Sequence, residues 1–348
     1  MPKYIGNKLH KFLHLPPAQA QHAPYPATKP WYDKAAQDSA PLDDTPDLLA
    51  AGKKRVQQMV GSFMYYRRAV NLTILKALNS LLHQQSSPTQ TTAKRTDQLL
   101  DYLATHPDVT VRFYASDMLL QVHSDASYMN EPDGRSTAGG HYFLGKPPID
   151  NQPIFLNGAI YSLCTTLKHV AASAAEAELG ALFLNTQEVK IIRLILQEMG
   201  HPQPATPIHC DNSTAVGIAN STVKRQRSRA MEMRYFWIID QVRNRYVRIL
   251  WHPGMENLGD YVTKHHSPKH HQHVRPYYTQ QPHSPRELTR ALKPSVLRGC
   301  VNPARTTQQS RMPLTRVRPR HTSQDTCHRA HNPFTYQSLL SRHNLVRT

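Results

Sequence analysis

Four widely spaced acidic residues constrain what this chain can fold into more than any other feature. Asp125 follows a run of β-forming residues in VHSDASY, and Glu178 lies in the helical stretch AAEAELGAL. Asp211 follows the strand pattern of IHCDNSTAV, and Asp260 lies in ENLGDYVTK. Each of the four lies where a predicted strand ends or a predicted helix begins, so we expect them to form one site in a sheet with alternating helices.

Carboxylates in this number predict a divalent metal. Mg²⁺ is held by a few carboxylates in near-octahedral geometry, while substrate phosphate and water fill the remaining positions. Two such ions, about 3.5 to 4 Å apart, activate a water and stabilise the leaving oxygen of a phosphodiester displacement. The set Asp125, Glu178, Asp211 and Asp260 therefore predicts a site for two ions of Mg²⁺ or Mn²⁺.

The pattern of apolar and turn-forming residues predicts a mixed α/β sheet with helices on both faces, preceded by a small helical region. In this sheet, three antiparallel strands are followed by parallel strands. The predicted strands are 117–123, 140–145, 158–164, 206–210 and 246–252. The predicted helices are 174–199, 212–220, 229–244 and 256–264, with an earlier helical periodicity over 47–83 and a helix over 92–104.

The motifs VHSDASY, AAEAELGAL, IHCDNSTAV and WHPGMENLGDYVTKHH, in this order, resemble the ribonuclease H domain of a copia-type retrotransposon polyprotein. The resemblance covers about residues 115–275 and implies a ribonuclease H-like fold. It places the four acids on the metal-binding acids of the family. Ser127 fits the family pattern beside Asp125 and is expected to contact nucleic acid. The two helical stretches over 47–104 resemble the thumb and connection region that precedes ribonuclease H in such reverse transcriptases.

The resemblance implies a function and its partners. We expect cleavage of the RNA strand in RNA–DNA hybrids by a two-metal mechanism, with the hybrid read by its shape and its 2′-hydroxyl groups. No tyrosine-x-Asp-Asp motif of a polymerase palm occurs in the sequence, so polymerase activity is not expected. The chain is thus expected to work with the missing polymerase portion of its polyprotein.

The resemblance and the composition together predict four segments. These are a largely disordered proline-rich linker over 1–46, a helical thumb and connection remnant over 47–114, the ribonuclease H-like domain over 115–275 and a basic disordered tail over 276–348. The formal net charge of +18 predicts a nucleic-acid partner, although a soluble basic protein or a basic tail also explains it.

Cysteine spacing and apolar runs predict the location of the protein. Four scattered cysteines fit a reducing compartment, and no apolar run approaches the length of a membrane helix. We therefore expect an intracellular protein without a membrane partner. Its expected place is the cytoplasm, in a virus-like particle, with the nucleus as a second location.

The helix AAEAELGAL offers two glutamates, and its periodicity selects one of them. Steps of three and four residues from Glu178 reach an apolar stripe, whereas the same steps from Glu176 reach a more polar face. Two residues apart, the glutamates point in nearly opposite directions around a helix. Glu178 is therefore predicted to face the sheet and bind metal.

Further candidates each have a plain structural alternative. Asp211 is a metal ligand or a helix N-cap, and Asn212 and Ser213 are caps or contacts to nucleic acid. His252 precedes Pro253 and is either a catalytic histidine, for proton transfer or product release, or a loop residue. A basic run is predicted to contact phosphate, with a solvated loop as its alternative: Lys224, Arg225, Arg227 and Arg229.

The histidines over 265–273 lack the cysteines and the spacing of a zinc finger, so they are interpreted as a solvated basic segment rather than a metal site. Two other functions stay open for the whole chain. One is a degenerate or co-opted retroelement fragment that binds nucleic acid without cutting it. The other is an integrase or transposase, whose acids run Asp, Asp, Glu, whereas glutamate is second here.

Overall fold

A five-stranded mixed sheet forms the centre of the computed structural model, which describes residues 3–27, 43–147, 154, 156–222 and 232–279. The strand order is β3-β2-β1-β4-β5. The strands β1, β2 and β3 are antiparallel, and β4 and β5 continue the sheet in parallel to β1. They span Leu119–Ser127, Thr137–Gly145, Ala159–Thr166, Thr206–Cys210 and Val247–Trp251. The predicted ribonuclease H-like sheet is thus confirmed.

Strand register brings two of the four acids to one edge of the sheet. In the parallel pair, His123 of β1 lies opposite His209 of β4. Asp125 and Asp211 each follow these histidines by two residues, so both acids lie near the C-terminal ends of their strands. On the other side of β1, Asp125 lies opposite Gly139 of β2.

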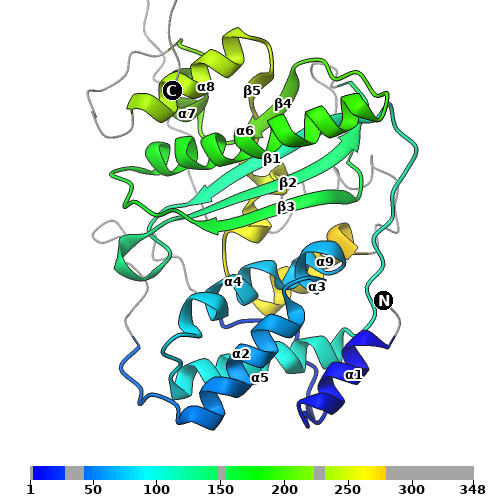
Figure 1. The fold of residues 1–348 in the computed structure, drawn as a ribbon, viewed down its shortest axis with the longest axis vertical. Helices are drawn as coiled ribbons and strands as arrows, with labels where there is room; N and C mark the ends of the chain where they lie inside the picture. Colours follow the sequence, from blue (N-terminus) through cyan, green and yellow to red (C-terminus); the bar gives the residue numbers. More distant parts are fainter. Residues whose placement is uncertain (1–2, 28–42, 148–153, 155, 223–231, 280–348) are drawn as a thin grey trace, which may run out of the picture. The chain divides into compact units, whose positions relative to one another are not determined.

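One face of the sheet is covered by the long helix α6 (Ala174–Glu198), which packs along β1 and β2 (Figure 1). Ser173 caps the helix by accepting a hydrogen bond from the amide of Glu176 at 3.2 Å. The helices α7 (Ser213–Ala219) and α8 (Glu232–Arg243) complete this cover beside β4 and β5. Leu182 and Val189 of α6 are fully buried in the apolar core of this face.

The second face is covered by elements from both ends of the described chain. They are η1 (Leu72–Ile74), α4 (Leu75–Gln84), η5 (Asp260–Val262) and α9 (Pro268–Thr279). One buried cluster joins Leu75 of α4, Phe143 of β2, Tyr261 of η5 and Tyr278 of α9. Helices on both faces, as predicted, are therefore confirmed.

A separate apolar cluster holds the N-terminal helices together. These are α1 (Tyr4–Lys11), α2 (Ala50–Phe63), α3 (Tyr66–Ala69) and α5 (Gln90–Thr105), and α4 adds Leu78 and Leu81 to the same cluster. The prediction of a linker over 1–46 is wrong for its first part, because Ile5, Phe12 and Tyr25 are buried in this cluster. The proline content hid an apolar stripe at helical spacing that also includes Leu9. Residues 28–42 lie outside the described part of the chain.

Two further predictions need correction. The helix predicted over 256–264 is replaced by two short 3₁₀ turns, η4 (Gly254–Glu256) and η5, because this segment follows the sheet edge closely at its glycines. The histidines over 265–273 are not a solvated segment. His265 and His266 precede helix α9, and His270, His271 and His273 lie in it. His271 is buried and Pro276 is internal, so the described helix runs past the predicted boundary at 276.

The boundaries at 114 and 115 stay predictions, and the predicted tail from 280 onward lies outside the described residues. Among the described helices, none combines the length and the apolar composition needed to cross a membrane.

Candidate metal centre

Asp125 is the most deeply buried of the four acids. Its side chain is only 2% exposed, near the end of β1. The Thr263 hydroxyl donates a hydrogen bond to its Oδ2 at 2.5 Å. Gly259 packs so closely that an added Cβ there would lie 3.0 Å from Asp125 Cβ. The carboxylate is therefore held by the chain segment that also carries Asp260.

Glu178 reaches the same point from helix α6. Its side chain is 5% exposed, and its Oε1 accepts a hydrogen bond from the amide of Ala126 at 3.1 Å. Glu176 instead lies at the exposed start of the helix, where its Oε2 accepts from the amide of Ala172 at 2.7 Å. The prediction that Glu178 and not Glu176 faces the sheet is confirmed, whereas metal binding by Glu178 stays a prediction.

Asp211 follows β4 and lies beside Glu178. Ligand atoms of Glu178, Cys210 and Asp211 all lie within 4.8 Å of one another. Gly254 approaches Asp211 so closely that an added Cβ would lie 2.5 Å from its Oδ2. The Asp211 carbonyl accepts a hydrogen bond from the indole of Trp251 at 3.0 Å. A glycine at position 254 thus leaves room for this carboxylate.

Asp260 is partly accessible, with a side chain 30% exposed. Its Oδ1 forms an ion pair with Lys264, and its Oδ2 lies 4.0 Å from His266 Nε2. Asn257 holds the preceding turn, because its Nδ2 donates to the carbonyl of Ser124 at 2.8 Å. The segment 257–264 therefore closes the site against the end of β1.

Burial and mutual repulsion shift the carboxyl groups of this site. Burial raises the pKa of Asp125 to about 7, and Asp260 and Asp211 add to the shift while Lys264 opposes it. Burial, followed by the charges of Asp125 and Asp211, raises the pKa of Glu178 well above its usual value. Burial also raises the pKa of Asp211. Three carboxylates are thus costly to keep charged at neutral pH without a cation.

Asp260 behaves differently from its neighbours. Burial acts to raise its pKa, but Lys264 and His266 outweigh burial and lower it below the usual value. The four acids therefore comprise one carboxylate already matched with cations and three that are not. Oxygen ligands from four elements around an unmet negative charge fit a hard divalent ion such as Mg²⁺ or Mn²⁺.

The other predicted site residues lie in different environments. Ser127 is 4% exposed and donates its hydroxyl to the carbonyl of Thr263 at 2.9 Å, and its predicted contact with nucleic acid stays a prediction. Asn212 is the N-cap of α7, accepting from the amide of Ala215 at 3.1 Å, and Ser213 is exposed beside it. Lys224, Arg225, Arg227 and Arg229 lie outside the described residues, so phosphate contact by this run stays a prediction.

His252 lies in the loop after β5, as predicted, but its ring packs away from open solvent. The ring centroids of His123 and His209 lie 5.3 and 5.4 Å from that of His252. Burial lowers the pKa of His252 below its ordinary value. A role of His252 in proton transfer stays a prediction.

Sequence reasoning missed the residues that position the acids. Thr263 and Lys264 follow Asp260 by three and four residues, a spacing that brings side chains together over one turn and was visible in DYVTK. His123 is two residues before Asp125, and its Nδ1 accepts from the amide of Leu258 at 3.0 Å. No local signal in the sequence pairs His123 with a residue so far along the chain.

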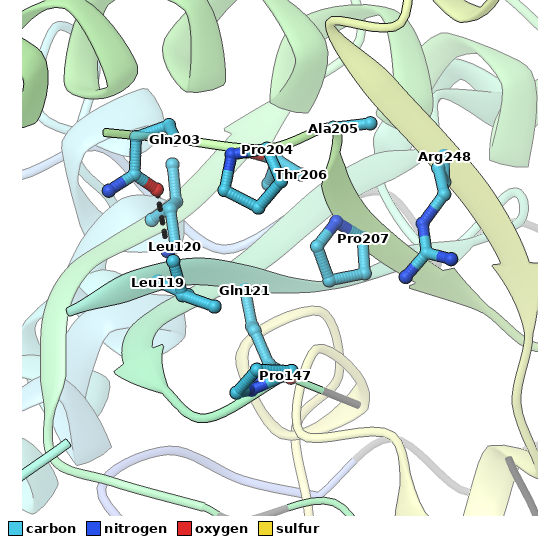
Figure 2. Close-up of a pocket in the computed structure, with 10 residues that line it drawn as sticks. All are labelled: Leu119, Leu120, Gln121, Pro147, Gln203, Pro204, Ala205, Thr206, Pro207 and Arg248. Atoms are coloured by element: carbon cyan, nitrogen blue, oxygen red, sulfur yellow. Dashed lines mark hydrogen bonds between the residues drawn. The ribbon is translucent and has the colours of Figure 1, made fainter. Parts of the chain in front are cut away.

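The cavity in Figure 2 lies at the opposite end of the strands from the acids. It is lined where β1 and β4 begin, by residues including Leu119, Gln121, Pro207 and Arg248. None of the four acids lines it. The acidic site therefore lies at the C-terminal ends of β1 and β4, and not in this cavity.

Retrotransposon polyproteins are similar to this chain in sequence. The Pol polyprotein from transposon TNT 1-94 of Nicotiana tabacum is 26% identical over 205 residues, which is 59% of the chain and 15% of that protein. The Pol polyproteins from transposons RE1 and RE2 of Arabidopsis thaliana are each 26% identical over 235 residues, 65% of the chain and 15% of the relative. The chain thus spans about 15% of the length of these relatives. No protein-family model matches the chain.

Solved ribonuclease H structures align with part of the chain. LC11-RNase H1 in complex with an RNA/DNA hybrid is 11% identical, with 41% of this chain and 93% of that chain covered and a TM-score of 0.31. RNase H1 from Halobacterium salinarum is 12% identical, with 42% and 94% covered and a TM-score of 0.31. At these scores the fold assignment rests on strand order and register. The four motifs predicted a retrotransposon polyprotein, and in sequence this chain is similar to part of the Pol polyproteins of plant retrotransposons.

Proposed function

We propose that this chain is a retroelement nuclease that cleaves the RNA strand of RNA–DNA hybrids with divalent metal. The observation that carries the proposal is the meeting of Asp125, Glu178, Asp211 and Asp260 at one sheet edge, from four separate elements. Similarity to retrotransposon Pol polyproteins supports the same function, because a retroelement has to remove its template RNA.

The protein's own groups prepare the site for the ions. When bound, two ions of Mg²⁺ or Mn²⁺ would supply an activated water and charge stabilisation for the leaving oxygen. Thr263 orients Asp125 by its hydroxyl, and the amide of Ala126 fixes Glu178. Both carboxylates are nearly inaccessible to bulk water, so their negative charge is available mainly to groups inside the site.

The proposed substrate and partners follow from the same reading. A ribonuclease of this kind recognises the shape of the hybrid and its 2′-hydroxyl groups rather than base edges. The rest of a polyprotein, including a polymerase portion, is the proposed partner, because the chain covers only 15% of its relatives. We also propose an intracellular location, in the cytoplasm within a virus-like particle or in the nucleus.

The division of the chain is part of this proposal. We propose a ribonuclease H-like domain over 115–275 that works together with the helical remnant over 47–114. Leu72 and Leu75 of the helical region share one buried cluster with Leu258 and Tyr261 beside Asp260. An assay should therefore use the full chain rather than residues 115–275 alone.

Cleavage of a labelled RNA–DNA hybrid by the full chain tests the proposal. We expect RNA-strand products that require Mg²⁺ or Mn²⁺ and are lost in Asp125→Asn. Asp260→Asn should reduce cleavage less, because Asp260 is partly exposed and already paired with Lys264. Asp133→Asn, in an exposed turn, is the matched control and should cleave normally. Hybrid binding without cleavage by the wild type would instead favour a non-catalytic retroelement fragment.

A further inference from the structure

Lys264 is the cation that the fold itself supplies to the acidic site. Its ammonium forms an ion pair with Asp260 Oδ1 across the short turn η5. The Lys264 side chain is 38% exposed, so the ammonium lies at the boundary between the acids and solvent. It thus lies beside Asp260, a partly exposed acid of the site.

The backbone beside Lys264 is fixed on the end of β1. The carbonyl of Thr263 accepts hydrogen bonds from Ser127 Oγ and from Asn130 Nδ2, each at 2.9 Å. The Thr263 hydroxyl donates to Asp125 Oδ2 and also lies 2.9 Å from the carbonyl of Asp260. The backbone before Lys264 is therefore fixed, and the ammonium can leave Asp260 by movement of the Lys264 side chain alone.

The charge of Lys264 acts on the whole site. For both Asp125 and Asp211, burial has the largest effect on the pKa and the charge of Lys264 the second largest. Lys264 lowers both pKa values. It also lowers the pKa of Glu178, where burial and the neighbouring acids act more strongly. A single ammonium thus offsets part of the repulsion among all four carboxylates.

We propose that Lys264 is a built-in counter-cation that competes with divalent metal for Asp260. In the metal-free protein, the ammonium neutralises Asp260 and relieves the cluster. A divalent ion that takes Asp260 as a ligand has to displace this ammonium, so Lys264 lowers metal affinity while stabilising the metal-free site. The inference rests on the proposed function in one respect, that the four acids are the metal ligands.

Titration of the full chain with Mn²⁺, without nucleic acid and at constant pH and ionic strength, tests this role. Lys264→Met keeps most of the side-chain volume and removes the charge. We expect it to bind Mn²⁺ about fivefold more tightly than the wild type, the scale of a partly exposed ion pair. The metal-free Lys264→Met protein should also melt at a lower temperature than the wild type.

Three controls make the result specific. Lys264→Arg retains the charge and should bind Mn²⁺ like the wild type, and so should Lys269→Met, which removes an exposed lysine of α9. In an Asp260→Asn background, Lys264→Met should change the Mn²⁺ affinity by less than about twofold, because the competing pair is already broken.

Unchanged or weaker Mn²⁺ binding by Lys264→Met would overturn the inference, as would a full effect in the Asp260→Asn background. Absence of Mn²⁺ binding by both the wild type and Lys264→Met would overturn it as well. The proposed nuclease activity has its own contradicting outcome, in which the wild type binds Mn²⁺ at these acids but does not cleave a hybrid. Tighter binding by Lys264→Met would then still support the competition.

Discussion

The two faces of the central sheet are built from different side chains. Alternate residues of β1 point to opposite faces. Leu120 and Val122 join the apolar core under α6, whereas Gln121 and His123 are buried outside that core. His141 and His209 are likewise buried outside it, and each has a ring nitrogen without a hydrogen-bond partner among the described residues.

The two faces therefore have different roles: the face under α6 mainly stabilises the fold, and the other face also positions the acidic site. The apolar face supplies a continuous core, in which most side chains are interchangeable by volume. The second face, called the polar face for its buried histidines, also carries the apolar cluster around Phe143 and Tyr261. It holds the segment that carries Asp260, because His123 Nδ1 accepts from the amide of Leu258 and the carbonyl of Ser124 accepts from Asn257. Changes on the first face should therefore alter unfolding, and changes on the second should also alter the site.

The largest expected effect is at the docking of the helical region on the polar face. Lys76 of α4 donates to Glu131 and, at 2.8 Å, to the hydroxyl of Thr137, with side-chain exposure of 5% for Lys76 and 10% for Glu131. Lys76→Met leaves a buried carboxylate unpaired and should lower the free energy of unfolding by about 3 to 5 kcal/mol in urea denaturation. The double variant Lys76→Met/Glu131→Gln should recover part of the loss. A loss below about 1 kcal/mol would mean that this pair does not hold the two regions together.

On the apolar face, Leu182→Ala removes a fully buried side chain of α6. The cavity should lower the free energy of unfolding by about 3 kcal/mol. Under conditions where the variant is folded, its Mn²⁺ affinity should equal that of the wild type. A weakened Mn²⁺ affinity would contradict the proposed separation between the two faces.

Asn257→Ala is the counterpart on the polar face. Asn257 is 5% exposed, and it donates to the carbonyl of Ser124 and accepts from the amide of Gly259 at 2.9 Å. Loss of both contacts should cost about 1 to 3 kcal/mol of stability. It should also weaken Mn²⁺ binding, measured by titration, because the turn before Asp260 is released. A stability loss of that size with unchanged Mn²⁺ affinity would show that the turn does not position the site.

The smallest expected effect is a pH dependence of the metal-free site. The pKa of Asp125 is raised to about 7 in the folded protein, so the folded state holds this proton more tightly than the unfolded chain. Its stabilising contribution is present below the unfolded pKa and is lost as pH rises through about 7. In EDTA, the stability of the wild type relative to Asp125→Asn should fall between pH 5 and 8, by less than about 1.4 kcal/mol per pH unit. Parallel pH curves for the two proteins would contradict this.

The parts that local periodicity encodes could be predicted from the sequence. The two-residue alternation of β1 and the apolar stripe from Glu178 through Leu182 and Val189 are visible without a structure. They were enough to place the strands, the long helix and the direction of Glu178. The N-cap role of Asn212 also follows from its position before STAV.

The cover of the polar face could not be predicted in the same way. It depends on contacts such as Ser80 Oγ with His265 Nε2 at 3.0 Å, between residues far apart in the chain. The stretch around Asp260 has helical composition, but Asp260 lies in a 3₁₀ turn because Gly259 has to fit against Asp125. Ser127 matched a functional motif, yet its hydroxyl serves the backbone of Thr263. Tertiary contacts decided each of these.

The central claim is that Glu178, buried against β1, belongs to a metal-dependent site, whereas its neighbour Glu176 only caps a helix. Cleavage of a labelled RNA–DNA hybrid in Mg²⁺ by Glu178→Gln and Glu176→Gln compares two identical chemical changes on one helix. Glu178→Gln should abolish cleavage while the protein remains folded, and Glu176→Gln should retain nearly all of it. Full activity in Glu178→Gln, or its loss in Glu176→Gln, would contradict the assignment of the site.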